Sequence, residues 1–357
     1  MLQYLVILLD DTSVAYCHAD NPLKERNLMP LETLKKGILF GMKQNLMIQY
    51  VFPDYALPKE YASVIESIDN VKIYPVGCKP VTGIDDGCEA DVIVANTVAF
   101  FVTKKEKETV TISETEMATM EKDLATIFET KMATVIRLPF SEMLKHKDAI
   151  AKLFASGARI NLCITDVEQF SDEQIETYKQ VLNEWNAVLL DLYKQGQSPQ
   201  FNLLTDRMML EKMHNCEAGV SNITLAPNGK FYLCPAFYYD EQTKVFNQLN
   251  HHQPSSDNSI GDLERGLNIL NPQLLQLDHA PLCRNCDAYH CRRCIWLNRR
   301  LTWDNNTPSH QQCVMAHIER NASRDLLNDI RKVGEFMPNI EIKEIKYLDP
   351  FEVRKEF

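Results

Sequence analysis

The sequence predicts an α/β protein in which a parallel sheet or barrel is followed by a smaller cysteine-rich part. Short apolar runs alternate with amphipathic segments along the first two hundred residues, as in strands joined by crossover helices. The composition changes near residue 207, because most of the 11 cysteines lie beyond it. A chain of 357 residues also exceeds the usual size of one core, so we expect two domains.

About six strand-and-helix units are expected before residue 207. The strands are expected at residues 4–9, 46–52, 71–76 with 91–95, 133–138, 159–165 and 200–204. Helix starts are signalled at Pro30, Pro58, Ser113, Ser141 and Ser171, and helix ends at Gly157 and Gly196. Beyond residue 207 we expect a hairpin over residues 222–235, a helix over 309–333 and a strand over 340–348.

Charge and hydropathy argue against several classes of protein. The net charge of -11 and the pI near 5.4 disfavour nucleic-acid binding, which needs a basic face. The N-terminal apolar run ends at Asp10 and Asp11 without a preceding basic region, so it predicts a strand and not a signal peptide. Residues 92–102 are apolar but too few to span a bilayer, so we expect a cytoplasmic protein without a membrane partner. No P-loop, GxGxxG, HExxH or GxSxG motif occurs.

The cysteines of the last third are the strongest chemical signal. In a reducing compartment, clustered thiols predict metal or redox chemistry and not disulfides. The segment CRNCDAYHCRRC, residues 283–294, places two CxxC pairs too close together to wrap one zinc ion, so its ligands are expected to split between two centres. One or two structural zinc ions, or unrelated buried thiols, are the alternatives. The candidate metal ligands are Cys216, Cys234, Cys283, Cys286, Cys291, Cys294 and Cys313.

The order and spacing of these cysteines, with Gly229 before Cys234 and IGDLERGLNIL before the cluster, resemble the SPASM domain of peptide-modifying radical SAM enzymes. The resemblance implies one auxiliary [4Fe-4S] cluster on Cys283, Cys286, Cys291 and Cys313. It implies a second, with an open iron site, on Cys216, Cys234 and Cys294. The gaps after Cys286 and Cys291 are each one residue shorter than usual, so the ligand pairing stays open. His290 and His310 are candidate ligands, or residues that only orient a ligand or lie on the surface.

By the same resemblance, the first part would be a partial (β/α)6 radical SAM-like barrel. The implied domains are residues 1–207 for the barrel, 208–335 for the SPASM-type domain and 336–357 for a C-terminal strand and tail. The loop after the first strand departs from that class, because it carries Cys17 alone where a CxxxCxxC motif is expected. Residues 51–58 read VFPDYALP in place of a GGEP-like motif. We therefore expect no cleavage of S-adenosylmethionine by this chain, with Cys17 a buried thiol.

Over its whole length, including the opening LQYLVILLDDTSVAYCH, the chain resembles the CXXX repeat peptide maturase family. The resemblance implies a role in the maturation of a ribosomally made, cysteine-rich precursor peptide. Because the radical-generating motif is missing, a second modification protein is a candidate partner. Two alternatives are open. The chain could be a non-catalytic precursor-binding scaffold with structural zinc or iron-sulfur sites. It could also be a zinc-stabilised nucleic-acid-binding protein, which the acidic charge disfavours.

Polar residues at the carboxyl ends of the expected strands are candidates for substrate binding, because ligand-handling groups of βα barrels lie there. These residues are Asp10, Asp11, Asp54, Asn96, Arg137 and Asp166. Each is also a residue type with ordinary structural roles in loops and caps. The basic residues Arg292, Arg293, Arg299 and Arg300 could attract an acidic leader peptide, offset the charge of clusters, or line a solvated helix face.

Overall fold

The computed structural model describes residues 2–76, 90–96, 131–210, 216–243, 258–291 and 293–334. The chain divides into two compact units, each built from two stretches of sequence. The first unit comprises Met1–Leu138 and Glu217–Gln276, and the second comprises Pro139–Cys216 and Leu277–Phe357. The domain boundaries expected at residues 207 and 335 divide the chain into consecutive segments, whereas each of these units combines two separate stretches. Those boundaries therefore stay a prediction.

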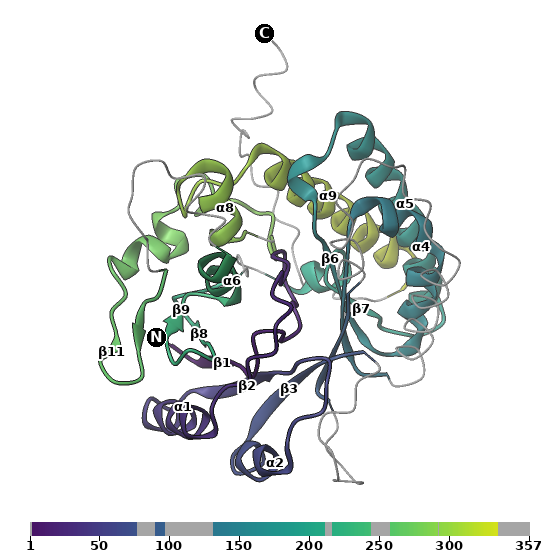
Figure 1. The fold of residues 1–357 in the computed structure, drawn as a ribbon. Helices are drawn as coiled ribbons and strands as arrows, with labels where there is room; N and C mark the ends of the chain where they lie inside the picture. The colour runs from purple at the N-terminus through teal and green to yellow at the C-terminus, as the bar shows by residue number, and fades with distance from the viewer. Residues whose placement is uncertain are drawn as a thin grey trace, which may run out of the picture. The chain divides into compact units, whose positions relative to one another are not determined.

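The first unit contains a mostly parallel sheet, which confirms the α/β class (Figure 1). Its strands lie in the order β5-β4-β3-β2-β1-β8-β9. Their bounds are β1 Tyr4–Leu8, β2 Met47–Val51, β3 Asn70–Pro75, β4 Val92–Asn96, β5 Ala133–Leu138, β8 Asn222–Leu225 and β9 Phe231–Tyr232. Strand β8 pairs in parallel with β1, and β9 returns antiparallel to β8 as the expected hairpin. The predicted strands of this unit are therefore confirmed to within one or two residues.

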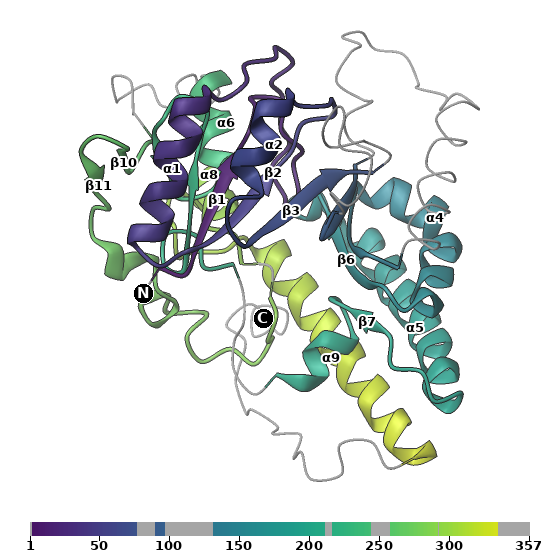
Figure 2. The ribbon, with the colours of Figure 1, turned by 90° about the horizontal axis from the view of Figure 1, so that it is seen from below.

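Helices cover both faces of this sheet. Helices α1 (Leu31–Lys43) and α2 (Lys59–Ile65) lie on one face of β1 to β3, and α6 (Pro235–Thr243) lies on the other (Figures 1 and 2). The expected starts after Pro30 and Pro58 are confirmed. Helix α1 approaches the sheet so closely that a Cβ atom at Gly37 would lie 2.3 Å from Leu225 Cδ2. A small hairpin of β10 (Gly261–Asp262) and β11 (Gly266–Leu267) follows in the chain.

The second unit pairs two parallel strands with long helices. The elements are β6 (Arg159–Ile164), β7 (Gln200–Phe201), α4 (Phe140–Leu153), α5 (Asp172–Lys194), α8 (Ile295–Thr302) and α9 (His310–Val333). Trp185 of α5 packs edge to face on Phe154 and Phe201, with ring centroids 6.0 and 5.5 Å away. Helices α5 and α9 lie side by side. Ser171 and Ser309 each close a capping box with the glutamine three residues on, so both expected starts are confirmed.

One helix start differs from the sequence prediction. Ser141 was expected to begin α4, but the helix begins at Phe140 after Pro139. The reason lies elsewhere in the chain, because Asp166 Oδ1 accepts a hydrogen bond of 2.8 Å from the Phe140 backbone N–H. A carboxylate from the loop after β6 therefore caps this helix, and local sequence carries no signal of it. Gly157, at φ +80°, ends the following 3₁₀ turn as expected.

Several predictions fall outside the described residues, among them the helix after Ser113, the role of Arg292 and the strand at 340–348. Helix α6 was not predicted, although Pro235 at its first position is a typical helix start. No helix in the described ranges combines the length and the apolar character needed to cross a bilayer.

Candidate metal centre

The cysteine loop, residues 283–291, is fastened to α9 by a buried aspartate. Asp287 Oδ1 accepts a hydrogen bond of 2.6 Å from Arg320 Nη1, and Oδ2 accepts one of 2.5 Å from Arg324 Nη2. The Asp287 side chain is 3% exposed. Burial alone would raise the pKa of this carboxyl, but the two guanidinium groups outweigh it and lower the pKa. The ionised carboxylate thus joins the centre of the loop to one face of the helix.

A buried ion pair holds the end of the same loop. Arg207 donates through Nη1 to the Tyr289 carbonyl at 2.7 Å and through Nη2 to Glu319 Oε2 on α9. Glu319 Oε1 accepts a further bond of 2.7 Å from the Tyr178 hydroxyl on α5. Both charged side chains are 3% exposed. Helices α5 and α9 and the turn that carries Arg207 therefore set the position of the loop.

The thiols of the loop influence one another's pKa, with Cys283 buried and Cys286 and Cys291 half-buried. Burial raises the pKa of Cys291 to about 12, with Arg207 lowering it and the charges of Cys283 and Cys286 raising it further. Burial also raises the pKa of Cys283, against the charge of Arg293. The three thiols are therefore within electrostatic reach of one another, and two guanidinium groups face them.

Helix α9 brings a histidine to this group. His317 Nε2 lies 3.6 Å from Cys286 Sγ, and the same sulfur accepts a bond of 3.4 Å from the Ala288 backbone N–H. Cys313 precedes His317 by one helical turn, so both lie on the same face of α9. The sequence analysis does not indicate His317; its candidate histidines are His290 and His310. The i, i+4 spacing of Cys313 and His317 is the signal that could have found it.

The residues present fit a thiolate-bound metal in chemistry. Thiolates are the ligands that zinc and iron-sulfur clusters prefer, and guanidinium groups beside Cys291 and Cys283 would offset their negative charge. Over the ranges that the structure describes, no three His, Cys, Asp or Glu side chains converge on one point as metal ligands. That Cys283, Cys286, Cys291 and Cys313 hold an iron-sulfur cluster, which would supply one-electron transfer, stays a prediction.

The second set of predicted ligands is spread over both units. Cys216 is exposed, and Cys294 is the N-cap residue of α8 in the second unit. Cys234 lies in the first unit, directly before α6. The second centre therefore stays a prediction. His290 is half-buried at φ +58°, and His310 is the exposed first residue of α9.

The arginines near the loop do not share one role. Arg293 is buried and donates through Nη2 to Asn306 Oδ1, so it does not belong to a solvated face. Arg300 lies over the Trp296 ring, with 5.3 Å from its guanidinium carbon to the ring centroid. Arg293 therefore supports the interpretation that basic residues offset thiolate charge.

Two of the predicted strand-end residues hold the loop after β1. Asp10 is fully buried and accepts bonds of 2.6 Å from Thr12 Oγ1 and 2.7 Å from the Tyr55 hydroxyl. Arg137, also fully buried, donates to the carbonyl of Cys17, to the Ala19 carbonyl at 3.1 Å and to Asp20 Oδ1 at 2.7 Å. The Arg137 guanidinium thus holds the loop after β1 at the end of β5.

The other strand-end residues lie in varied settings. Asp54 is exposed after β2, and Asn96 ends β4 opposite Arg137 in register. Asp166 belongs to the second unit, where it caps α4, and burial raises its pKa. Asp11 accepts a hydrogen bond from the Tyr238 hydroxyl. Their role in peptide binding stays a prediction.

Cys17 has a tyrosine neighbour that sequence inspection did not indicate. Tyr239 of α6 is 2% exposed, and its hydroxyl has no hydrogen-bond partner in the described part of the chain. Burial raises its pKa, as do the charges of Cys17 and Cys234, while Arg137 lowers it. The loop after β1 and the start of α6 therefore place two half-buried thiols around one buried phenol.

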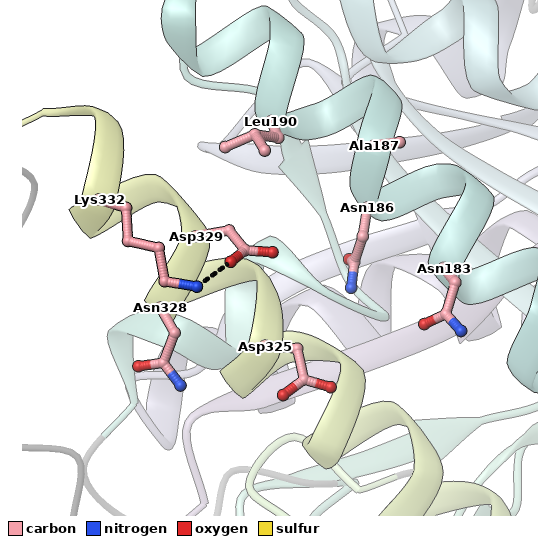
Figure 3. Close-up of a pocket in the computed structure, with 8 residues that line it drawn as sticks. All are labelled: Asn183, Asn186, Ala187, Leu190, Asp325, Asn328, Asp329 and Lys332. Carbon is pink, nitrogen blue, oxygen red and sulfur yellow. Dashed lines mark hydrogen bonds and ion pairs between the residues drawn. The ribbon is translucent and has the colours of Figure 1, made fainter.

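A separate polar groove of about 490 Å³ runs between α5 and α9 (Figure 3). Its lining residues are Asn183, Asn186, Ala187, Leu190, Asp325, Asn328, Asp329 and Lys332. Asn186 Nδ2 donates to the Ala322 carbonyl at 2.8 Å, which ties the two helices together. None of the lining residues is a thiol or an imidazole, so the groove is a seam of helix packing and not part of the candidate metal centre.

Comparison with known proteins adds little to these observations. No described protein family and no curated protein matches the chain. Among solved structures, the crystal structure of Streptococcus suis SuiB bound to precursor peptide SuiA matches with 13% identity and a TM-score of 0.35. The match covers 72% of this chain and 62% of the SuiB chain, which is less than two thirds of that protein. A TM-score of this size assigns neither a fold nor a function.

Replacing Asp287 tests the attachment of the cysteine loop. Asp287→Asn should lower the free energy of unfolding by about 2 kcal/mol, because it removes a buried charge shared by Arg320 and Arg324. The control Asp329→Asn breaks an exposed ion pair with Lys332 on α9. It should change the free energy of unfolding by less than about 0.5 kcal/mol. Urea denaturation measures both variants, and equal losses would contradict the anchoring role.

Replacing Arg137 tests the clamp on the loop after β1. Arg137→Met should lower the free energy of unfolding by about 3 kcal/mol, because the carbonyls of Cys17 and Ala19 lose a buried guanidinium donor. The control Arg159→Met removes a pair whose arginine is 49% exposed and should cost less than about 1 kcal/mol. Thermal or urea unfolding distinguishes them, and a mild Arg137→Met variant would show that the loop does not need the guanidinium.

Proposed function

We propose that this chain is an iron-sulfur protein that takes part in the maturation of a ribosomally made, cysteine-rich precursor peptide of the CXXX repeat kind. The observation that carries the proposal is the cysteine loop, whose buried and half-buried thiols shift one another's pKa beside Arg207 and Arg293. Clustered thiolates without disulfide partners are what an iron-sulfur site requires. The cysteine spacing of the SPASM type supports the peptide-maturation role.

The fold proposed with this function is a partial (β/α)6 radical SAM-like barrel over residues 1–207 and a SPASM-type domain over 208–335, with a strand and tail over 336–357. The parallel order of β1 to β5 supports the first part. The second [4Fe-4S] cluster, on Cys216, Cys234 and Cys294, belongs to the same proposal.

The chain would act beside a second modification protein. Its loop after β1 offers one thiol, Cys17, and a [4Fe-4S] cluster needs about four ligands, so this loop cannot hold the cluster that cleaves S-adenosylmethionine. The auxiliary centres would then relay electrons or bind a thiolate of the precursor peptide. Asp10, Asp54, Asn96, Arg137 and Asp166 are proposed as peptide-binding residues, with Asp54 the most exposed of them.

A non-catalytic scaffold with structural zinc is the second candidate, and the contact of Cys286 with His317 favours it. A tetrahedral zinc ion with bonds of about 2.3 Å to sulfur and about 2.05 Å to nitrogen places these two ligand atoms about 3.6 Å apart. The distance between Cys286 Sγ and His317 Nε2 is 3.6 Å. A sulfur hydrogen bond has the same length, so metal identity decides between the two candidates.

Anaerobic reconstitution with iron and sulfide tests the proposal. The purified protein should turn brown, with broad absorbance near roughly 400 nm and two [4Fe-4S] clusters' worth of iron. Cys286→Ala should lose about four of those iron atoms, whereas Cys163→Ala, a buried thiol of β6 outside the ligand set, should keep them all. Colourless protein that binds zinc stoichiometrically would contradict the iron-sulfur function and support the scaffold.

Incubation of the reconstituted, reduced protein with S-adenosylmethionine tests the missing radical chemistry. No 5'-deoxyadenosine should form, because Cys17 alone cannot hold the cleaving cluster. Chromatography with mass detection measures the product, and a radical SAM enzyme with a CxxxCxxC motif is the positive control. Catalytic amounts of 5'-deoxyadenosine from this chain would overturn the expectation.

A further inference from the structure

The buried side chain of His317 lies beside a cysteine of the candidate metal centre. Its side chain belongs to the third turn of α9 and is 9% exposed. Its Nε2 atom lies 3.6 Å from the sulfur of Cys286, a distance that suits a hydrogen bond to sulfur. A buried imidazole nitrogen that faces a thiol is a specific contact, because an unpaired ring nitrogen in such a place would be costly.

The proton on this contact can be assigned from the chemistry of a metal-bound cysteine. A cysteine that binds a metal is a thiolate, so its sulfur can accept a hydrogen bond but cannot donate one. The imidazole must then carry its proton on Nε2 and donate it. The Ala288 N–H also donates to the same sulfur, at 3.4 Å. Cys286 would therefore be the thiolate of this loop that receives both a backbone and an imidazole donor.

The neighbouring contacts keep His317 in place. Glu319 and Arg320 follow it on α9. Glu319 forms an ion pair with Arg207, which holds the cysteine loop, and Arg320 forms one with Asp287 of the loop itself. The helix therefore cannot rotate or slide without breaking these ion pairs. These two ion pairs, two and three residues beyond His317, hold the imidazole at its distance from Cys286.

We propose that His317 is a positioning residue of the iron-sulfur centre, whose Nε2–H donates to the Cys286 thiolate and raises the reduction potential of the cluster bound there. The inference rests on the proposed function. Reduction by one electron adds negative charge that is shared with the cysteine sulfurs, and a hydrogen-bond donor stabilises that charge. No bond is made or broken in this step, and the electron comes from an external reductant.

The test compares midpoint potentials of the reconstituted protein by spectroelectrochemistry. His317→Leu removes the donor, so at a fixed solution potential the ratio of reduced to oxidised cluster should fall about tenfold. His317→Gln keeps an N–H donor and should recover a large part of the loss. Asn328→Leu, on the same helix but exposed and outside the ligand set, should keep the wild-type potential. A His317→Leu protein with a wild-type potential would overturn the inference.

A second readout uses the wild-type protein and does not depend on the folding of a variant. Pulsed electron paramagnetic resonance of the reduced cluster should show a weak coupling to an imidazole nitrogen, which vanishes in His317→Gln. Absence of that coupling in brown, reduced wild-type protein overturns only the inference. Wild-type protein that forms no cluster overturns the proposed function, and the inference with it.

Discussion

The buried ion pair between Arg207 and Glu319 is the contact on which the candidate metal centre depends. It connects the turn after β7 to α9, and the same two residues reach Tyr289 of the cysteine loop and Tyr178 of α5. A buried ion pair adds little stability compared with an apolar pair, but it is costly to break and so allows one arrangement. The pair therefore sets the register of α9 against the loop, and with it the position of Cys313 and His317.

The residues that hold the loop also set its electrostatics. Arg207 fixes the backbone at Tyr289 and lowers the pKa of Cys291, against the effect of burial. Arg293, bound to Asn306, acts in the same direction on Cys283. Buried thiols without a cation stay protonated, whereas a bound metal would displace their protons. Structural support and charge compensation are thus supplied by the same guanidinium groups.

In the first unit, the loop after β1 is held by residues that had been expected at a ligand site. Arg137 donates hydrogen bonds to Cys17, Ala19 and Asp20 of this loop. The carboxylate of Asp10 accepts hydrogen bonds from Thr12 and Tyr55. These contacts order the loop that carries Cys17. The Cys17 thiol lies near the buried phenol of Tyr239, whose pKa its charge raises.

Local features of this chain could be predicted from sequence alone because they depend on neighbouring residues. Pro30, Pro58, Ser171 and Ser309 start helices through their own backbone or side-chain chemistry, and the apolar runs become parallel strands. The spacing of the cysteines likewise identifies a thiol-rich loop. Only the tertiary structure decided which distant groups meet: Asp166 with Phe140, Arg137 with Cys17, and His317 with Cys286. These contacts join residues far apart in the chain, so their partners follow from packing and not from any local pattern.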